Sequence, residues 1–240
     1  MTQFSYADVV AATSPSSNWS KFGVHPVADR LLWFLANYAP IHPNALTIGA
    51  SVLGFAAAFC YLQGDAVGMI AGAALFYSSF AIDTIDGALA RLTNQRSATG
   101  AWLDTMTDFL RSMTVAPAFA VGVYRQVHDV LALYLGFAVM GVGLWYYYQA
   151  EISEKLTAQR PAQMAATSNA PFMQRIRRLG IVPSPFGLAD YEAVYLVIFP
   201  LLGRPLEGMV VALIAGVLSR VAVAFVVLAR LRHRFEQDPQ

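Results

Sequence analysis

Four aspartates stand in an otherwise apolar part of this chain of 240 residues: Asp83, Asp86, Asp104 and Asp108. An ionised carboxylate within a membrane costs several kcal/mol unless a partner compensates it. Residues three or four apart share one face of a helix. The spacing therefore predicts two helices, each of which turns an acidic stripe toward the other.

Carboxylates that converge between two helices repel one another strongly at low dielectric, so protonation or bound cations must relieve them. The oxygen ligands have no neighbouring His or Cys, which favours Mg²⁺, Mn²⁺ or Ca²⁺ over Zn²⁺. Two divalent ions would balance four carboxylates and could bridge a diphosphate. The stripes thus indicate two-metal phosphoryl chemistry.

Small residues continue the same two stripes at Gly87, Ala90 and Gly100. They leave a shallow floor on which a nucleotide could lie, although glycine in a membrane helix also serves close helix packing. Arg91 lies one turn further on and could hold a phosphate through its planar fork. Its alternative role is that of a cytoplasmic anchor.

The elements that must position these residues are membrane helices. Hydrophobic residues make up 57% of the chain and charged residues only 13%, which is far from the composition of a soluble domain. A spanning helix needs roughly 20 mostly apolar residues. Six segments qualify, at about 44–63, 66–91, 100–124, 128–151, 187–203 and 206–230. The expected fold class is all-α, with six transmembrane helices and both termini on one side.

An N-terminal segment precedes the first span. Between Asn18 and Pro40, apolar residues alternate with Lys21, Asp29 and Arg30, which suits an amphipathic helix in the membrane interface. The residues before it are polar and do not resemble a secretory signal. We expect an interfacial segment over 1–43, a transmembrane domain over 44–231 and a tail over 232–240.

Basic residues predict the orientation, since cytoplasmic loops collect Lys and Arg. Among the predicted loops, only Arg125 and Arg204 fall on the side away from the termini. Both termini and the acidic cluster are therefore expected on the cytoplasmic side of the inner membrane. The basic run at 175–178 could attract anionic lipids or serve only as a marker of orientation.

The segment from Asp83 to Asp108 resembles the signature of the CDP-alcohol phosphotransferase family, D-x-x-D-G-x-x-A-R followed, after a spacer, by G-x-x-x-D-x-x-x-D. Every fixed position of that pattern is matched. The resemblance implies an enzyme that transfers a substituted phosphate from a CDP-linked donor to an alcohol and releases CMP, with Mg²⁺ or Mn²⁺ required. It also implies a homodimer in the membrane, and no nucleic-acid partner is expected.

The family's residue roles carry over to the matching positions. Asp83, Asp86 and Asp104 would coordinate metal, and Asp108 would approach the metals and act as general base on the acceptor hydroxyl. The cytidine and diphosphate would be held by Gly87, Ala90, Arg91 and Gly100. The stretch from Pro43 to Thr47 resembles a further family feature, so Asn44 or Thr47 would touch the nucleotide; Asn44 could instead cap the first span.

Other ionisable residues are candidates for the acceptor pocket: Arg111, Asp190, Glu192, Arg177 and Arg178. Arginines facing the pocket would suit a phosphorylated acceptor, whereas the acids would suit a neutral polyol or an amino alcohol. Arg111 and Arg220 could instead pair with Asp190 or Glu192 as internal supports. The aromatic run from Trp145 to Tyr148 is typical of interface anchors.

The leading functional hypothesis is transfer of a phosphatidyl group from CDP-diacylglycerol to a small polar alcohol. A second hypothesis reverses the lipid side, with a soluble CDP-alcohol donating its head group to a diacylglycerol-like lipid. A divalent-cation transporter is a remote alternative, because its acids would line a path through the membrane. Here the acids lie at one face beside Arg91, which would repel a cation.

Overall fold

The computed structural model describes the chain except for residues 1–2, 14, 40, 158–173, 176–177, 179–180, 183–185 and 238–240, and it leaves the side chains of 157 and 233–237 undescribed. Within the described residues the regular structure is helical throughout. The N-terminal elements are α1 (Tyr6–Ala12), the π-helical turn η1 (Ser20–Val24) and α2 (His25–Tyr38). The rest are α3 (Pro43–Gln63), α4 (Ala66–Leu92), α5 (Ala98–Val127), α6 (Leu131–Thr157), α9 (Leu188–Glu192), the π-helical turn η2 (Ala193–Ile198), α10 (Phe199–Leu201) and α11 (Pro205–Gln237).

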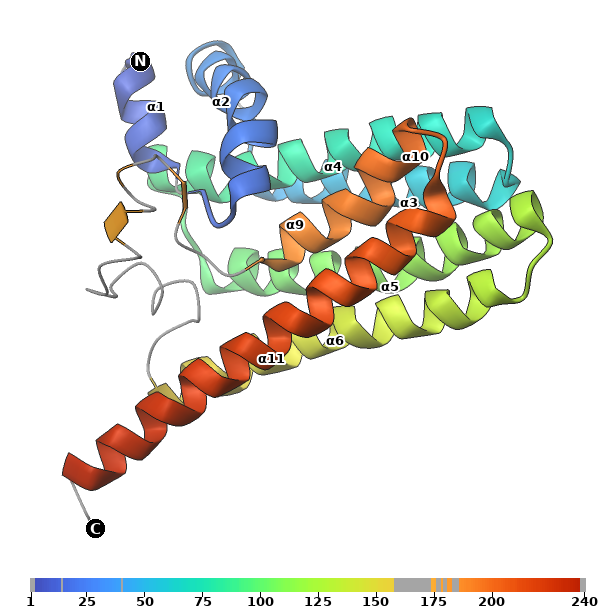
Figure 1. The fold of residues 1–240 in the computed structure, drawn as a ribbon. Helices are drawn as coiled ribbons and strands as arrows, with labels where there is room; N and C mark the ends of the chain where they lie inside the picture. Colours follow the sequence, from blue (N-terminus) through green and yellow to red (C-terminus); the bar gives the residue numbers. More distant parts are fainter. Residues whose placement is uncertain are drawn as a thin grey trace.

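The long helices lie side by side in one bundle (Figure 1). Helix α3 packs against both α4 and α5, and α6 packs against α5 and α11. The continuous segment from α9 to α10 contacts α4 and α11. The two aspartate-bearing helices, α4 and α5, thus share α3 as a common support.

Four helices in the described part of the chain are long and apolar enough to cross a membrane: α3, α4, most of α6 and most of α11. With 30 residues, α5 has the length, but its charged residues lower its hydropathy. The predicted span at 187–203 is a shorter helix that passes through a π-helical turn and ends after Pro200. The chain is an all-helical membrane protein, and six crossings stay a prediction.

The core of the bundle is built on buried aromatic side chains. The rings of Tyr61 and Phe119 meet edge to face at 5.0 Å between centroids, and Phe119 meets Tyr195 at 5.8 Å. Tyr191 continues the series, at 5.3 Å from both Tyr195 and Tyr146. These pairs join α3, α5, η2, α9 and α6, so they fix α5 relative to four of its neighbours in the bundle.

One glycine allows the closest of these helix contacts. A Cβ on Gly122 of α5 would lie 1.9 Å from the carbonyl oxygen of Tyr61. No side chain can replace hydrogen there unless the backbones separate. The end of α3 is therefore held directly against α5, and the two helices keep one register.

The N-terminal elements cover the end of α4. Ala28 and Leu32 of α2 pack in one cluster with Ile85 and Leu89 of α4. The opposite face of α2 leaves Phe34 53% exposed. The helix lies in the predicted segment, while its place at the membrane interface stays a prediction.

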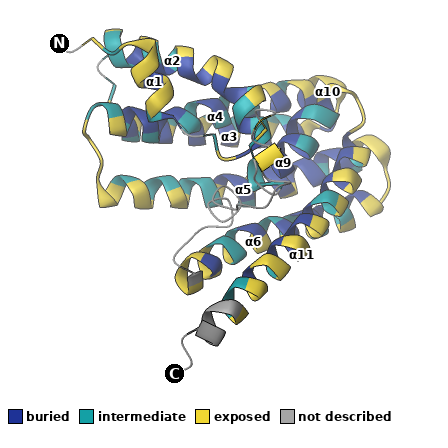
Figure 2. Cartoon of the chain, turned by 60° about the vertical axis from the view of Figure 1, so that its left-hand side comes forward, coloured by how far each residue is buried: buried dark blue, intermediate teal, exposed yellow. Residues whose placement is uncertain are grey.

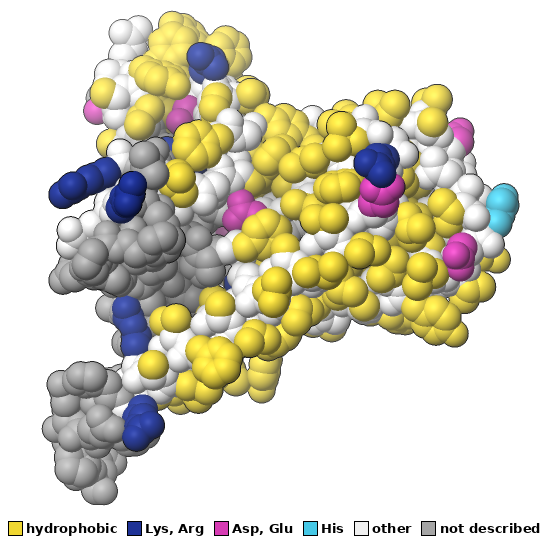
Figure 3. Space-filling model, viewed as in Figure 1, with side chains coloured by type: hydrophobic (Ala, Val, Ile, Leu, Met, Phe, Trp, Pro, Cys, Tyr) yellow, Lys and Arg dark blue, Asp and Glu magenta, His cyan; other side chains and the backbone are white. Residues whose placement is uncertain are grey.

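Apolar side chains dominate the outer surface of the long helices. Ile214, Leu218 and Phe225 follow one exposed face of α11 (Figure 2). In the space-filling view, hydrophobic side chains cover this bundle, and most of the visible Lys and Arg gather toward the end that holds the N-terminus (Figure 3). Both observations agree with helices surrounded by lipid and a basic side on one face. Helix α11 runs to Gln237, so the predicted tail from 232 begins inside it.

Candidate active site

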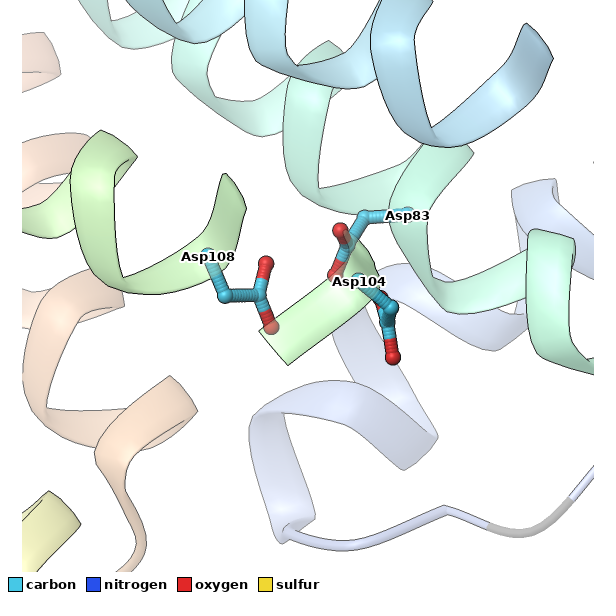
Figure 4. Close-up of side chains that lie close together, drawn as sticks. All are labelled: Asp83, Asp104 and Asp108. Atoms are coloured by element: carbon cyan, nitrogen blue, oxygen red, sulfur yellow. The ribbon is translucent and has the colours of Figure 1, made fainter. Parts of the chain in front are cut away.

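Three of the four aspartates converge. Asp83 comes from α4, and Asp104 and Asp108 come from α5; one carboxylate oxygen of each lies within 4.8 Å of the others. Figure 4 shows Asp83 and Asp108 reaching toward each other from the two helices. All three are half-buried. The helical spacing predicted that all four aspartates would converge, and the structure brings these three together.

Asp86 lies outside this group of three. It follows Asp83 by one turn of α4 and is only 5% exposed. Its Oδ2 accepts a hydrogen bond of 2.5 Å from the hydroxyl of Thr47 in α3. Asp86 and Asp104 both line the cavity described next, so Asp86 still faces the same region of the site.

A cavity of about 280 Å³ opens beside these acids, between the start of α3, the end of α4 and the start of α5. All six residues predicted to hold the nucleotide line this cavity: Asn44, Thr47, Gly87, Ala90, Arg91 and Gly100. A Cβ on Gly87 would meet only an Arg91 nitrogen, at 3.4 Å. The missing side chain at this position therefore leaves room in the cavity.

The connection between α4 and α5 supplies further walls that the sequence analysis missed: Gln95, Arg96 and Ser97. Ser97 is the N-cap of α5, and its hydroxyl accepts from the N–H of Gly100 at 3.0 Å. A Cβ on Gly100 would lie 3.0 Å from that hydroxyl and 3.1 Å from the Asn44 side-chain oxygen. A Ser directly before an apolar helical run is an N-cap signal that was available in the sequence.

Arg91 also contacts the N-terminal elements. Its Nε donates to the carbonyl oxygen of Ala12, at the end of α1, at 2.8 Å. The guanidinium therefore lies between the cavity and α1. The positive charge of Arg91 therefore lies at the entrance of the cavity and not inside the helix bundle.

A second cavity, of about 550 Å³, lies on the other side of the aspartates. Asp83, Asp104 and Asp108 line one wall, and Glu192 and Arg220 line others. Asp104 lines both cavities, so the carboxylates stand at the junction between them.

The donor set fits a hard divalent cation. Three carboxylates from two helices present oxygen atoms close enough to share one ion, and no sulfur or imidazole is part of the group. Mg²⁺ and Mn²⁺ prefer such oxygen ligands. Asp83, Asp104 and Asp108 would hold the metal, with Asp86 next to them.

A model described as CDP-alcohol phosphatidyltransferase matches residues 40–170, more than half of the chain. The chain belongs to this family. The match begins just before α3 and includes the four aspartates of the two stripes and all six residues predicted to hold the nucleotide. Members of the family are transferases of phospholipid biosynthesis, which agrees with a helical membrane protein.

Among solved structures, the chain is similar to the phosphatidylinositol phosphate synthase of Mycobacterium tuberculosis with CDP-DAG bound. The TM-score is 0.56 at 20% sequence identity, and the match covers 84% of this chain and 94% of the other. At this identity the likeness establishes a shared fold. A comparison with curated proteins found no significant match.

Arg111 of this phosphatidyltransferase does not pair with Asp190 or Glu192 as internal support. Its Nη1 lies 3.1 Å from Oδ1 of Asp83, and its Nη2 lies 2.6 Å from Oδ1 of Asp108. It also lines the second cavity, but the guanidinium is almost fully buried. Its part in an acceptor pocket stays a prediction, and its ion-pair partners differ from those expected.

Asp190 and Glu192 have separate roles, although they are two residues apart. Asp190 accepts from the N–H groups of Trp19 and Gly187, each at 2.8 Å, so it caps α9 and ties it to η1. Glu192 accepts a bond of 2.6 Å from the Ser112 hydroxyl and lines the second cavity. Of the two acids only Glu192 lines this cavity, and its part in acceptor binding stays a prediction. A capping acid at the third position of a helix was a signal available in the sequence.

The remaining predicted acceptor residues come from the basic run. Arg177 lies outside the described residues. Arg178 is exposed and is not among the described residues that line either cavity. Their part in acceptor binding stays a prediction.

The aromatic run from Trp145 to Tyr148, in the second half of α6, does not consist of interface anchors alone. Tyr148 is exposed, but Tyr146 is buried, donates to the carbonyl of Phe186 at 2.9 Å and lines the second cavity. The Arg220 guanidinium lies over its ring at 3.6 Å. Tyr147 also lines this cavity. Sequence composition alone does not separate the buried face of such a run from its lipid face.

Proposed function

We propose that this CDP-alcohol phosphatidyltransferase transfers a phosphatidyl group from CDP-diacylglycerol to a small polar alcohol and releases CMP. The observation that carries the proposal is the position of Asp104 on two adjoining cavities, with the predicted nucleotide residues around one and Asp108 in the other. Two substrates bound on either side of the carboxylates would meet where the acids converge. The structural neighbour that has CDP-DAG bound supports the choice of a lipid-linked donor.

The donor's nucleotide would occupy the smaller cavity. Gly87 and Gly100 give it a floor without side chains, and Arg91 and Arg96 supply positive charge for the phosphates. Thr47 and Asn44 offer polar groups to the ring or the ribose. The diphosphate would then extend toward Asp104.

Bound Mg²⁺ or Mn²⁺, for which we expect two ions, would neutralise the diphosphate and make CMP a better leaving group. Asp83, Asp86, Asp104 and Asp108 are the residues proposed to hold them. Positioning and charge compensation supply most of the rate enhancement in phosphoryl transfer.

Asp108 is the proposed general base. Its Oδ1 is engaged by Arg111, and its second oxygen is available to an acceptor hydroxyl in the larger cavity. As the hydroxyl oxygen forms a bond to the phosphorus that carries the diacylglycerol, its proton passes to the carboxylate. The bond between that phosphorus and the bridging oxygen breaks, and the electron pair leaves with CMP.

The acceptor would lie among Glu192, Tyr147 and Arg220 in the larger cavity. Hydroxyl and carboxylate groups there can orient a polyol by hydrogen bonds. The setting we propose is the cytoplasmic membrane, with the site facing the cytoplasm and the protein acting as a homodimer. The excess of basic residues on the side of the termini supports this orientation.

The test uses purified protein in lipid nanodiscs with labelled CDP-diacylglycerol and a panel of alcohols. We expect metal-dependent CMP release and a new lipid whose mass identifies the acceptor. If CMP is released only when a soluble CDP-alcohol and diacylglycerol are supplied, the donor and acceptor sides are reversed. Ion uptake into proteoliposomes without CMP release would contradict a transferase altogether.

A further inference from the structure

We infer that Arg111 is a positioning residue, which holds the carboxylates of Asp83 and Asp108 in the orientation that metal binding requires. The inference rests on the proposed function, because it assigns a role to a residue beside the proposed metal ligands. Arg111 is not a fixed position of the sequence signature, which ends at Asp108.

The guanidinium joins the two acidic helices. Arg111 belongs to α5, and Nη1 reaches Asp83 across in α4, at 3.1 Å. Nη2 returns to Asp108 of its own helix, at 2.6 Å. The planar fork of arginine fixes both directions at once. A lysine ammonium, which is a point charge, could not fix the two carboxylates in the same way.

Each carboxylate gives only its Oδ1 to the arginine. The second oxygen of each carboxylate lies outside the fork, and both residues belong to the group whose ligand atoms lie within 4.8 Å of one another. The arginine also carries positive charge between two acids that would otherwise repel each other. It therefore holds the acids together before any metal arrives.

The arginine is itself held by α3. A Cβ on Gly54 would lie 2.6 Å from Cδ and 2.7 Å from Cγ of Arg111. The side chain of Arg111 thus crosses α3 where that helix has no side chain. Ser79 of α4 lies 3.4 Å from Nη1, and its hydroxyl donates to the carbonyl of Ala50 in α3 at 2.6 Å.

Stability is a weaker explanation for this residue. Burying an ion pair costs desolvation that often equals the attraction gained, so an apolar side chain of similar volume would stabilise the bundle as well. Arg111 is 3% exposed and also has Glu192 near it in the larger cavity. Arg111 donates both ends of its guanidinium to proposed metal ligands. A role in orienting these two carboxylates explains that arrangement better than a contribution to stability.

The test uses variants that move or replace the Arg111 guanidinium but keep a positive charge at this position. In Gly54→Ala the new methyl group collides with the middle of the Arg111 side chain, so the guanidinium must move. Gly49→Ala is the matched control, because it lies on the same helix and a Cβ there meets nothing within 4 Å. Arg111→Lys keeps the charge and loses the fork.

The measurements are the dissociation constant for Mn²⁺, by electron paramagnetic resonance of the purified protein in nanodiscs, together with Tm, kcat and the KM for the donor. Outer partners of metal ligands typically contribute 10- to 100-fold in affinity or activity. We expect Gly54→Ala and Arg111→Lys to bind Mn²⁺ about tenfold or more weakly and to lose kcat. Their donor KM should stay near the native value, because Arg111 does not line the nucleotide cavity.

Three results would overturn the inference and can be told apart. If the native protein and Gly49→Ala bind Mn²⁺ and both test variants bind it equally well, Arg111 does not position the ligands, while the proposed function stands. If the native protein binds no Mn²⁺, the metal-dependent function fails together with the inference. A lower Tm with unchanged Mn²⁺ affinity in the test variants would assign Arg111 a structural role only.

Discussion

Thr47 of α3 donates its hydroxyl to Oδ2 of Asp86 in α4, at 2.5 Å, and both groups are buried. The same two residues line the proposed nucleotide cavity. The bond therefore connects the first helix of the membrane domain to the acidic stripe. It also fixes the orientation of the Asp86 carboxylate beside the cavity.

The first prediction concerns this bond. Thr47→Val keeps the shape of the side chain and removes the donor, which leaves a buried carboxylate oxygen unpartnered. A hydrogen bond to a charged group is worth about 1.5 to 3 kcal/mol, so kcat/KM for the donor should fall roughly tenfold to a hundredfold. Thr47→Ser is the control and should stay near the native rate. Equal rates for the Val and Ser variants would show that the bond has no part in donor binding or turnover.

The second prediction concerns the floor of the nucleotide cavity. In Gly87→Ala the methyl group points into open space near Arg91, so it should obstruct the donor without straining the helix. We expect a raised KM for the donor with Tm unchanged or slightly higher, since alanine favours helix by about 1 kcal/mol over glycine. Gly49→Ala should share the gain in Tm and keep the native KM. A native KM in Gly87→Ala would place the nucleotide elsewhere.

The third prediction concerns the metal. Removing divalent ions with a chelator should abolish CMP release, because the converging carboxylates would otherwise have no cation between them and the diphosphate. Mg²⁺ or Mn²⁺ should restore turnover, and Zn²⁺ should do so poorly, since the cluster has oxygen ligands only. Full activity in the presence of excess chelator would contradict the assignment.

The fourth prediction separates Asp108 from the nucleotide side. Asp108→Asn removes a proton acceptor and changes little in volume, so kcat should fall by at least 10². Binding of the donor's nucleotide should be much less affected, because Asp108 lines only the larger cavity among the two described. Binding of CMP measured by calorimetry supplies the comparison. A kcat within a few-fold of the native value would exclude Asp108 as the general base.

The fifth prediction compares the two acids at the start of the fifth apolar segment. Asp190→Ala removes the acceptor that ties α9 to the start of η1 and the acceptor that caps α9. The change should cost about 2 kcal/mol of folding stability, read as a lower Tm, with the acceptor KM little changed. Glu192→Gln should raise the acceptor KM, because Glu192 lines the larger cavity. The opposite pattern would exchange the two roles.

Much of this site could be predicted from the sequence because its spacing is local. Asp104 and Asp108 share a face by helical geometry alone, and so do Gly87 and Arg91 with the acids of α4. The apolar runs likewise placed both ends of α3 and α4 within one residue, whereas α6 and α11 continue to Thr157 and Gln237, beyond the predicted ends at 151 and 230. Periodicity and hydropathy act within one helix, so they are readable without knowledge of its neighbours.

The tertiary structure decided which helix faces which. Arg111 could have paired with Asp190 or Glu192 by charge, yet the packing of α3 through Gly54 sends its side chain to Asp83 and Asp108. Asp190 and Glu192 are two residues apart in sequence, yet they point in different directions on α9. Asp190 caps the helix, and Glu192 lines the larger cavity. Contacts between distant segments depend on helix register and on close approach of backbones. The pattern of residues along one helix specifies neither its register against another helix nor how closely their backbones approach.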